Sequence, residues 1–314
     1  EYLSNNFNYK ILYVTLDEND KYFYKKEKIN FFYFSSLSFA YTLLSYIRAN
    51  LLITTINDIG NKGFLKKNKK IKKYVYIFHS LISTLSGYHY NSLKNYDVIL
   101  CSAKYQISEI RFLEKKYNQT KKKLIPLGYS RFIDLQKNKT TIDKKTVLLA
   151  FTWGKDSFFS ISRLEKLIRL LFENNYKVCI RPHPETLKRN RKDLIFLANK
   201  FKNNDLVIDD LRSDYYLYIS SLLITDWSGI FFDYYFGLNK KTLFIKSDRK
   251  INNPDFLNYN LETFEEKIRN ELSKELEISE ILKKMNAEYI TIDNNFLYKN
   301  FYRNFDRFIK TIIN

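Results

Sequence analysis

Apolar residues in this chain gather in short runs, and these runs alternate with stretches that have helical spacing. In the first half the strand-like runs are 9–17, 30–35, 51–56, 73–80, 96–103 and 122–128, and the helix-like stretches are 37–48 and 104–117. Within 104–117, apolar side chains such as Ile107, Ile110 and Leu113 lie near a helical repeat. Nearly continuous apolar strands separated by helices are typical of a parallel sheet covered on both faces.

The same alternation restarts after a polar stretch over 129–145, which we interpret as a linker. The later strands are expected at 146–153, 176–182, 205–210, 221–227 and 241–247, and the helices at 157–173, 185–201, 213–220, 229–237, 261–275 and 297–312. The pattern predicts an α/β fold with two doubly wound, Rossmann-like domains, 1–135 and 136–296. A C-terminal helix within 297–314 is expected to pack back onto the first domain. Domains of this kind bind ligands at the carboxyl ends of their strands, and two facing domains form a cleft.

Composition supports a chain with a substantial core. Of the 314 residues, 45% are hydrophobic, which favours a globular protein over a disordered one. Cys101 and Cys179 lie inside apolar runs, so we expect buried thiols rather than a disulfide framework. We recognise no signal peptide, and the apolar stretch 29–47 is too interrupted by turn-prone residues for a membrane span.

The net charge of +19 favours an anionic partner: nucleic acid, anionic lipid or a phosphate-bearing substrate. A second explanation is compositional, because Lys, Asn, Ile, Tyr and Phe are all abundant, as an AT-rich genome would produce. Lysine clusters at 66–73, 115–123 and 137–145 favour a negative partner for the first half of the chain, and solvated loops are the alternative.

Unusual residues fall at the ends of predicted strands, and the stretch 225–234 gives the clearest helix start. Asp226 or Ser228 can cap the helix, and Gly229 would let a ligand approach the backbone closely. A helix N-terminus of this kind binds phosphate. Asp233 could then reach ribose hydroxyls. Ordinary capping, and for Asp233 a polar residue within an interface, are the alternatives.

The stretch 181–185 reads Arg-Pro-His-Pro-Glu and follows another predicted strand. Arg181 is suited to a bidentate phosphate contact. His183 could donate to a phosphate oxygen or, as imidazolium, assist the leaving group. Pro182 and Pro184 would stiffen the loop that holds both side chains, although prolines can also simply end a strand.

Two further strand ends carry candidate residues. His79 is the natural general base for an acceptor hydroxyl near pH 7, with Ser80 and Ser83 on the acceptor side, unless it is only a hydrogen-bonded strand end. Gly154 could line a nucleotide pocket with its backbone, and Trp153 would pack against a base or, as we favour, against the core. We find no Cys and His cluster for a metal and no Asp-x-Asp signature, so no metal or other cofactor is expected.

These motifs occur in the order seen in one family. The stretches FHSLIST, YDVILCSAKYQISEIR, LLAFTWGKDS, YKVCIRPHPE, ITDWSGIFFDYYFGLNKKTLFI and INNP resemble the CDP-glycerol glycerophosphotransferase family, the teichoic-acid polymerase and primase group, and its short bacterial members in particular. The resemblance is good over 73–260 and weak over 1–72. Many members have a His-Gly-Thr run with a nearby lysine, whereas this chain has His79-Ser80-Leu81-Ile82-Ser83, which leaves the acceptor and donor open.

The resemblance implies a GT-B fold whose C-terminal domain binds the nucleotide. It also implies that His183 and the Ser228–Gly229 turn hold the diphosphate and that His79 is the base. We therefore expect glycerol phosphate, or a related alditol phosphate, to pass from a CDP-activated donor to a hydroxyl of a surface-glycan or lipid-linked acceptor, with release of CMP. The expected location is the cytoplasm, peripheral to the inner face of the bacterial plasma membrane and its anionic surface.

Two other functions stay open. A GT-B glycosyltransferase could use the same diphosphate site for a CMP- or UDP-activated sugar in capsule or lipopolysaccharide synthesis. Nucleic-acid binding is the other, since the chain is basic and 17% aromatic, but the aromatic residues lie in strand-like runs where core positions are expected.

Overall fold

The computed structural model describes residues 6, 8–16, 30–60, 66–137, 140–272, 275–288 and 290–313. The pairs of neighbouring strands given below are parallel, so the predicted α/β class with parallel sheets is confirmed. The chain divides into two compact units. The first unit holds 1–76, 91–98 and 313, and the second holds 77–90, 99–312 and 314. The predicted domain boundary near residue 135 and the GT-B-like pairing of two domains around a cleft stay predictions.

The first unit contains two pairs of strands and one helix. Strand β1 (Leu12–Thr15) pairs with β2 (Asn30–Tyr33), and β3 (Ala49–Thr54) pairs with β4 (Ile71–Ile77), of which residues 71–76 lie in this unit. Helix α2 (Leu37–Tyr46) begins where the Ser36 hydroxyl accepts a hydrogen bond from the amide of Ser38. Tyr74, Val75 and Tyr76 of β4 are almost fully buried, as the apolar run over 73–80 predicts.

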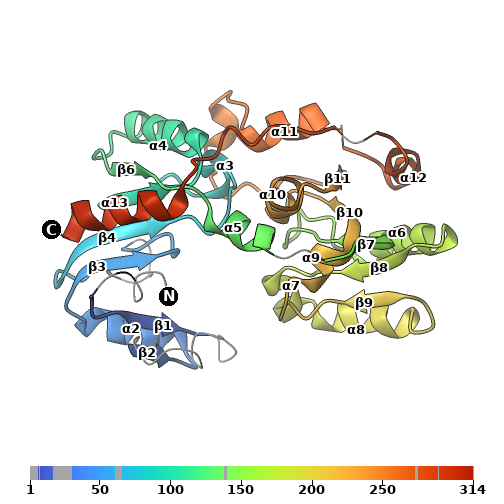
Figure 1. Ribbon diagram of the computed structural model, residues 1–314, viewed down its shortest axis with the longest axis horizontal. Helices are drawn as coiled ribbons and strands as arrows, with labels where there is room; N and C mark the ends of the chain where they lie inside the picture. The colour runs from blue at the N-terminus through green and yellow to red at the C-terminus, as the bar shows by residue number, and fades with distance from the viewer. Residues whose placement is uncertain are drawn as a thin grey trace. The chain divides into compact units, whose positions relative to one another are not determined.

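The second unit is built around a five-stranded sheet of order β11-β10-β7-β8-β9 (Figure 1). Its strands are β7 (Asp143–Leu149), β8 (Lys177–Ile180), β9 (Leu206–Ile208), β10 (Ser220–Thr225) and β11 (Lys241–Phe244). Side chains alternate between two cores, since Val147 and Leu149 pack with helix α6 (Ile161–Glu173) while Leu148 packs with Leu217 and Tyr234. Both faces of the sheet are therefore covered by apolar side chains.

The second unit contains further helices and strands. They are α3 (Thr84–Gly87), β5 (Val98–Cys101), whose first residue lies in the first unit, α4 (Lys104–Lys116), β6 (Lys123–Pro126), α5 (Ser130–Lys137), α7 (Pro184–Arg189), α8 (Arg191–Lys200), α9 (Tyr215–Ile219), α10 (Ile230–Phe232), the π-helix η2 (Asp233–Gly237), the 3-10 turn η3 (Phe256–Asn258), α11 (Phe264–Leu272), η4 (Ile278–Glu280), α12 (Ile281–Met285) and α13 (Phe301–Ile313), whose last residue lies in the first unit. Cys101 and Cys179 are free and buried, as expected.

One prediction fails in the stretch 129–145, which is not a bare linker. Residues 130–137 form α5, and Phe132 and Leu135 are buried against the π-helix. The helix fits so closely that a methyl group on Gly237 would lie 2.8 Å from Cδ1 of Leu135. Only two apolar residues make this contact, which is too few to create a visible repeat in the sequence.

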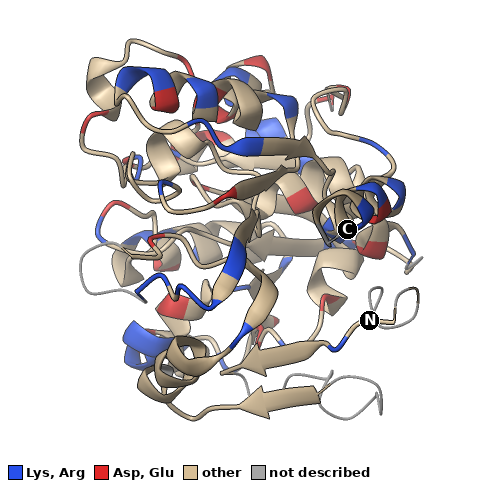
Figure 2. Ribbon diagram, turned by 90° about the vertical axis from the view of Figure 1, so that its left-hand side faces the viewer, with Lys and Arg blue, Asp and Glu red and all other residues tan. Residues whose placement is uncertain are grey.

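The lysines of the predicted basic clusters are not all exposed to solvent. Figure 2 shows basic and acidic residues interspersed along the ribbon. Lys122, in the cluster 115–123, is buried with its ammonium 3.5 Å from the carboxylate of Glu114. At least this lysine balances an internal charge.

Across the described part of the chain, no helix is both long enough and apolar enough to span a membrane.

Candidate active site

The first candidate loop follows β4 and carries His79. Its imidazole is exposed, while the surrounding protein lowers the pKa of His79 by desolvation. The hydroxyl of Tyr129 donates to the carbonyl of His79 at 3.2 Å, and that of Tyr105 donates to the carbonyl of Leu81. The backbone of the loop is therefore held at two points, while the His79 ring remains accessible.

Two buried carboxylates fix the end of this loop. Glu109 accepts hydrogen bonds from the Ser83 hydroxyl at 2.8 Å and from the amide and hydroxyl of Thr84, and Glu265 accepts from the Ser83 amide at 2.8 Å. Burial raises the pKa of Glu109 to about 7, against the lowering effect of these hydrogen bonds. Ser83 itself is fully buried and caps α3. Its hydroxyl is thus part of the framework of the loop and not of its open face.

The motif INNP supports the same segment. The amides of Asn252 and Asn253 donate to the carbonyl of Ser86, and the Asn253 side chain donates to the carbonyl of Leu85. These contacts join the INNP segment to α3, which begins at the end of the FHSLIST stretch.

The second candidate loop follows β10. Asp226 is fully buried, and its two oxygens accept from the amides of Thr152 at 2.7 Å and Phe158 at 3.0 Å. Burial raises the pKa of Asp226 to about 6, although these two amides and that of Ser228 oppose the shift. Asp226 therefore joins the loop to both ends of the Trp153 segment. The side chain of Ser228 stays half-exposed.

The two loops meet at Gly229 and Ser80. A methyl group on Gly229 would lie 3.0 Å from the Ser80 hydroxyl, which is tighter than ordinary contact, and 3.4 Å from Ile82. The φ of Gly229 is −64°, so a side chain is excluded by the neighbour and not by the backbone conformation. The structure thus brings His79's loop and the Asp226–Gly229 loop together.

The third candidate loop follows β8 and carries His183. Its Nδ1 accepts a hydrogen bond of 3.1 Å from the amide of Glu185 at the start of α7. Burial, with smaller contributions from Lys250 and His79, lowers the pKa of His183 despite the opposing charge of Glu185. Neutral His183 with an accepting Nδ1 must carry its proton on Nε2.

Arg181 and Asp233 belong to a network of ion pairs. Arg181 pairs with Asp209 and with Asp214 at 3.1 Å, and it donates to the carbonyl of Ser213 at 2.9 Å. Arg131 of α5 pairs with Asp214 at 2.7 Å and with Asp233 at 3.2 Å. The guanidinium groups of both arginines therefore already have carboxylate partners.

Asp233 has one oxygen without a hydrogen bond. Its Oδ2 accepts from Arg131, whereas Oδ1 is buried and has no partner. Burial raises the pKa of Asp233 to about 6, while Arg131 acts in the opposite direction. This residue begins the π-helix, a rare conformation that is often found at functional sites.

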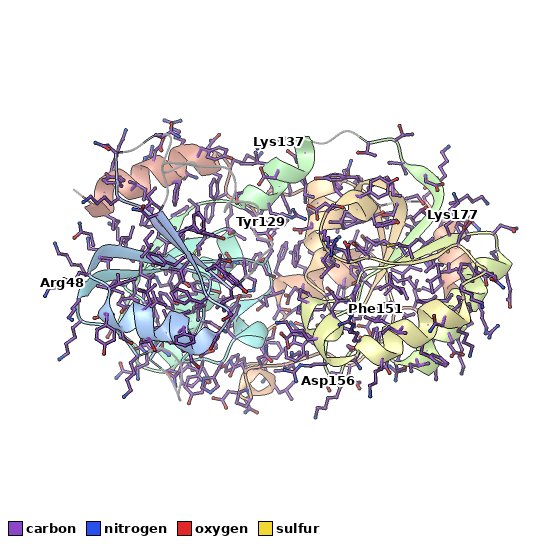
Figure 3. The ribbon with its side chains drawn as sticks, turned by 90° about the horizontal axis from the view of Figure 1, so that it is seen from below. Arg48, Tyr129, Lys137, Phe151, Asp156 and Lys177 are labelled. Carbon is purple, nitrogen blue, oxygen red and sulfur yellow. The ribbon has the colours of Figure 1, made fainter. Side chains whose placement is uncertain are left out.

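Trp153 and Gly154 lie on the segment between buried Phe151 and Asp156, both labelled in Figure 3. Gly154 has a φ of +103° and open space where a side chain would start. Trp153 is half-buried, with its ring 6.0 Å from that of His183. Trp153 thus lies beside the candidate site and outside the fully buried core that we favoured.

Several residues of this arrangement were missed by sequence reasoning. Arg131 lies in the supposed linker, and Glu109 lies in a helix that we read only for its apolar repeat. Arg249 and Arg269 stack on Trp227, with their guanidinium carbons 4.7 and 3.9 Å from its ring centroid. Glu109 could have been found from the sequence, because it is a charged residue at a position that the helical repeat places on the buried side.

A comparison with models of protein families shows the family of this chain. The model described as CDP-Glycerol:Poly(glycerophosphate) glycerophosphotransferase matches residues 1–308. The chain belongs to this family. The family assignment agrees with the resemblance seen in the motifs, and it places the chain among glycerophosphotransferase enzymes.

A curated relative of this glycerophosphotransferase family member is the "Minor teichoic acid biosynthesis protein GgaB" of Bacillus subtilis (strain 168), 25% identical over 168 residues. The match covers 45% of this chain and only 17% of that relative. Two solved structures share 13% identity with this family member: UDP-GlcNAc 2-epimerase of Methanocaldococcus jannaschii with UDP-GlcNAc and UDP (TM-score 0.48, 77% of this chain and 69% of that chain), and MnaA of S. aureus with UDP (TM-score 0.47, 77% and 80%). At these scores the likeness says nothing about what this chain binds.

In the described part of this family member, no group of three His, Cys, Asp or Glu residues is placed to hold a metal ion. That the reaction needs no metal or other cofactor stays a prediction.

Proposed function

We propose that this chain transfers glycerol phosphate, or a closely related alditol phosphate, from a CDP-activated donor to a hydroxyl group. An acceptor oxygen would form a bond to the β-phosphorus as the bond between that phosphorus and the CMP oxygen breaks. The acceptor proton passes to the base, and CMP leaves with the bonding electron pair. The observation that carries the proposal is that Ser80, directly after His79, lies against Gly229, while the Trp153 ring lies 6.0 Å from that of His183 on the segment held by Asp226, in a member of this family.

His79 is the proposed base. Its lowered pKa leaves the exposed imidazole neutral at pH 7, so a ring nitrogen can accept the acceptor's proton. The backbone contacts from Tyr129 and Glu109 fix the loop, which limits the cost of orienting the ring.

His183 is proposed to donate a hydrogen bond and not a proton. Because its Nδ1 accepts from the Glu185 amide, the Nε2–H is the group available to a phosphate oxygen. The lowered pKa of His183 argues against the imidazolium form at neutral pH. Electrostatic stabilisation of phosphate oxygens by such fixed donors is the main protein contribution in phosphoryl transfer.

The contribution of the turn at Ser228–Gly229 is proposed to come from Ser228. Its amide already interacts with Asp226, but α10 continues directly into the π-helix η2, so the amides at the start of this helical segment stay a second proposed phosphate contact. The half-exposed hydroxyl of Ser228 remains the candidate contact. Asp233, through its unpaired oxygen, is kept as a proposed contact to a ligand hydroxyl.

The acceptor is proposed to be an anionic surface polymer or a lipid-linked precursor, because the net charge of +19 would attract either. Binding to an anionic membrane surface is part of this proposal and should weaken as salt is added. Co-sedimentation with vesicles of anionic and of neutral lipid, at low and high salt, checks it.

Donor identity tests the proposal directly. The chain is incubated with CDP-glycerol, CDP-ribitol, CMP-sugars and UDP-sugars, and nucleotide release and the mass of the product are measured. We expect CMP from a CDP-alditol only, with a product heavier by one alditol phosphate. Release from a nucleotide sugar with a glycosidic product would instead establish a glycosyltransferase. His79→Ala and His183→Ala should each abolish most of the release. His79→Ala should retain the wild-type melting temperature, whereas His183→Ala removes the side-chain cap of α7 and should lower it slightly.

A further inference from the structure

Lys250 occupies an unusual position in the segment after β11. It is half-buried, and its Nζ lies 3.1 Å from the ring centroid of Trp153. Among the described residues, its ammonium has neither an ion pair nor a hydrogen bond. The aromatic face of Trp153 is thus the one favourable contact of this charge that the structure gives.

The carboxylates near Lys250 do not satisfy it. Burial lowers the pKa of Lys250, and the charges of Asp156 and Glu185 oppose this effect without forming an ion pair with the ammonium. Glu185 is in addition bound by Lys188 at 3.3 Å and by Arg189 at 3.0 Å. Lys250 is therefore partly stripped of water without a fixed counter-ion, which is costly unless an anion completes the site.

The position of Lys250 places it beside His183. Trp153 contacts the ammonium, and its ring lies 6.0 Å from the imidazole. Lys250 is also among the charges that lower the pKa of His183. Next to them, Gly154 leaves open space where other residues have a side chain.

We propose that Lys250 binds a phosphate oxygen of the donor's diphosphate, alongside the Nε2–H of His183. The identity of the donor rests on the proposed function, whereas the recognition of a diphosphate rests on this geometry. A lysine ammonium serves as a point charge for phosphate, and the cation–π contact with Trp153 would hold it in place. Lys250 is thus a binding residue that none of the sequence motifs marks.

The test measures direct binding, without any requirement for activity. Titration calorimetry with CDP, UDP, inorganic pyrophosphate and cytidine is done on the full chain and on Lys250→Met. We expect the variant to lose about tenfold or more in affinity for CDP and pyrophosphate and none for cytidine. Lys250→Arg, which keeps the charge, should recover part of the loss.

Lys246→Met is the matched control. Lys246 lies four residues earlier, is exposed and pairs with Glu277 at 2.9 Å, so its removal should leave all four affinities unchanged. If wild type binds UDP and not CDP, the proposed donor is wrong, and the loss on Lys250→Met is then judged with UDP and pyrophosphate. Affinities of Lys250→Met within twofold of wild type, an equal loss for cytidine, or no binding of any diphosphate by wild type would overturn the proposal.

Discussion

Arg181 and Lys250 are both cations near His183, and they differ in what surrounds them. Arg181 is nearly buried and is paired with Asp209 and Asp214. Lys250 contacts an aromatic ring, and its ammonium has no ion-pair partner within the described residues. The residue that the sequence motif singles out is therefore already neutralised inside the protein. The residue that no motif marks is the one with charge available for a ligand.

The comparison teaches that proximity along a motif does not assign a role. Arg181 lies two residues from His183, yet its guanidinium joins the strand ends through Asp209 and the loop of Ser213. An arginine fork suits a carboxylate as well as a phosphate, so sequence alone could not choose between them. Its role as a phosphate ligand stays a prediction, and stability measurements can separate the two roles.

The largest expected effect is on folding. Arg181→Met leaves the buried carboxylate of Asp209 without its partner, so we expect the free energy of unfolding to fall by about 3–5 kcal/mol. Urea unfolding followed by circular dichroism measures it. Lys250→Met is the matched comparison and should cost less than about 1 kcal/mol, because no ion pair is lost. Equal losses for the two variants would remove the distinction between these cations.

His183 lies next to both cations, and its loss should be felt in catalysis. His183→Ala should lower kcat by about 100-fold or more, because a fixed donor to the phosphate is removed. Steady-state CMP release measures this effect. His89→Ala is the control, since the His89 ring contacts that of Tyr90 outside the proposed site, and its kcat should stay within about twofold of wild type. A His183→Ala enzyme with near-normal turnover would show that the network around Arg181 holds the phosphates after all.

The network of Arg181 and Arg131 should also give a pH signature through Asp233. Its folded pKa of about 6 is above the model-peptide value, so between about pH 4 and 6 the folded state binds the extra proton. The stability that Asp233 contributes is therefore greatest at low pH and declines as pH rises through this window. Asp233→Asn keeps an oxygen for Arg131 but cannot ionise.

Urea unfolding of both proteins at pH 5, 6 and 7 tests this sign. The stability of Asp233→Asn relative to wild type should rise with pH, on the order of 1 kcal/mol over the range. A difference that does not change with pH would mean that Asp233 is ionised throughout and fully compensated by Arg131.

Much of the fold could be read from the sequence because apolar runs mark strands buried on both faces. Val147 to Leu149 and Val178 to Ile180 are examples, and both runs became core strands. The helix predicted over 185–201 is split in the structure at Asn190, whose amide donates to the carbonyl of Thr186 at the end of α7 and whose carbonyl accepts from the amide of Leu194 at the start of α8. The short α3 was not predicted, because it depends on Glu109 and Glu265 from elsewhere in the chain.

The site was only partly readable, for a related reason. Which side chains follow strand ends can be seen in a sequence, but which of them are consumed by internal partners cannot. Asp226, Ser83 and Arg181 were all reasonable ligand contacts until their partners, Thr152, Glu109 and Asp209, were known. The partners that bind these side chains internally lie 26 to 74 residues away in the sequence, so the local pattern could not show that the side chains are occupied.

For Gly229, too, the question is whether the residue faces a ligand or an internal neighbour, and here the expected effect is the smallest. It was expected to let a ligand approach, yet the atom that a methyl group would meet at 3.0 Å is the Ser80 hydroxyl. Gly229→Ala should therefore reduce kcat/KM by a few-fold, since the neighbour must give by only a few tenths of an ångström. The double variant, in which Ser80→Ala removes the hydroxyl that the new methyl group would meet, should recover most of the lost kcat/KM.

A double-mutant cycle on kcat/KM, with Ser80→Ala alone as the reference, measures this coupling. Recovery of kcat/KM in the double variant would show that Gly229, like Arg181, is constrained by an internal neighbour and not by a ligand. If the double variant stays as impaired as Gly229→Ala, the added methyl group obstructs a ligand, and Gly229 belongs with Lys250 on the open side of the site.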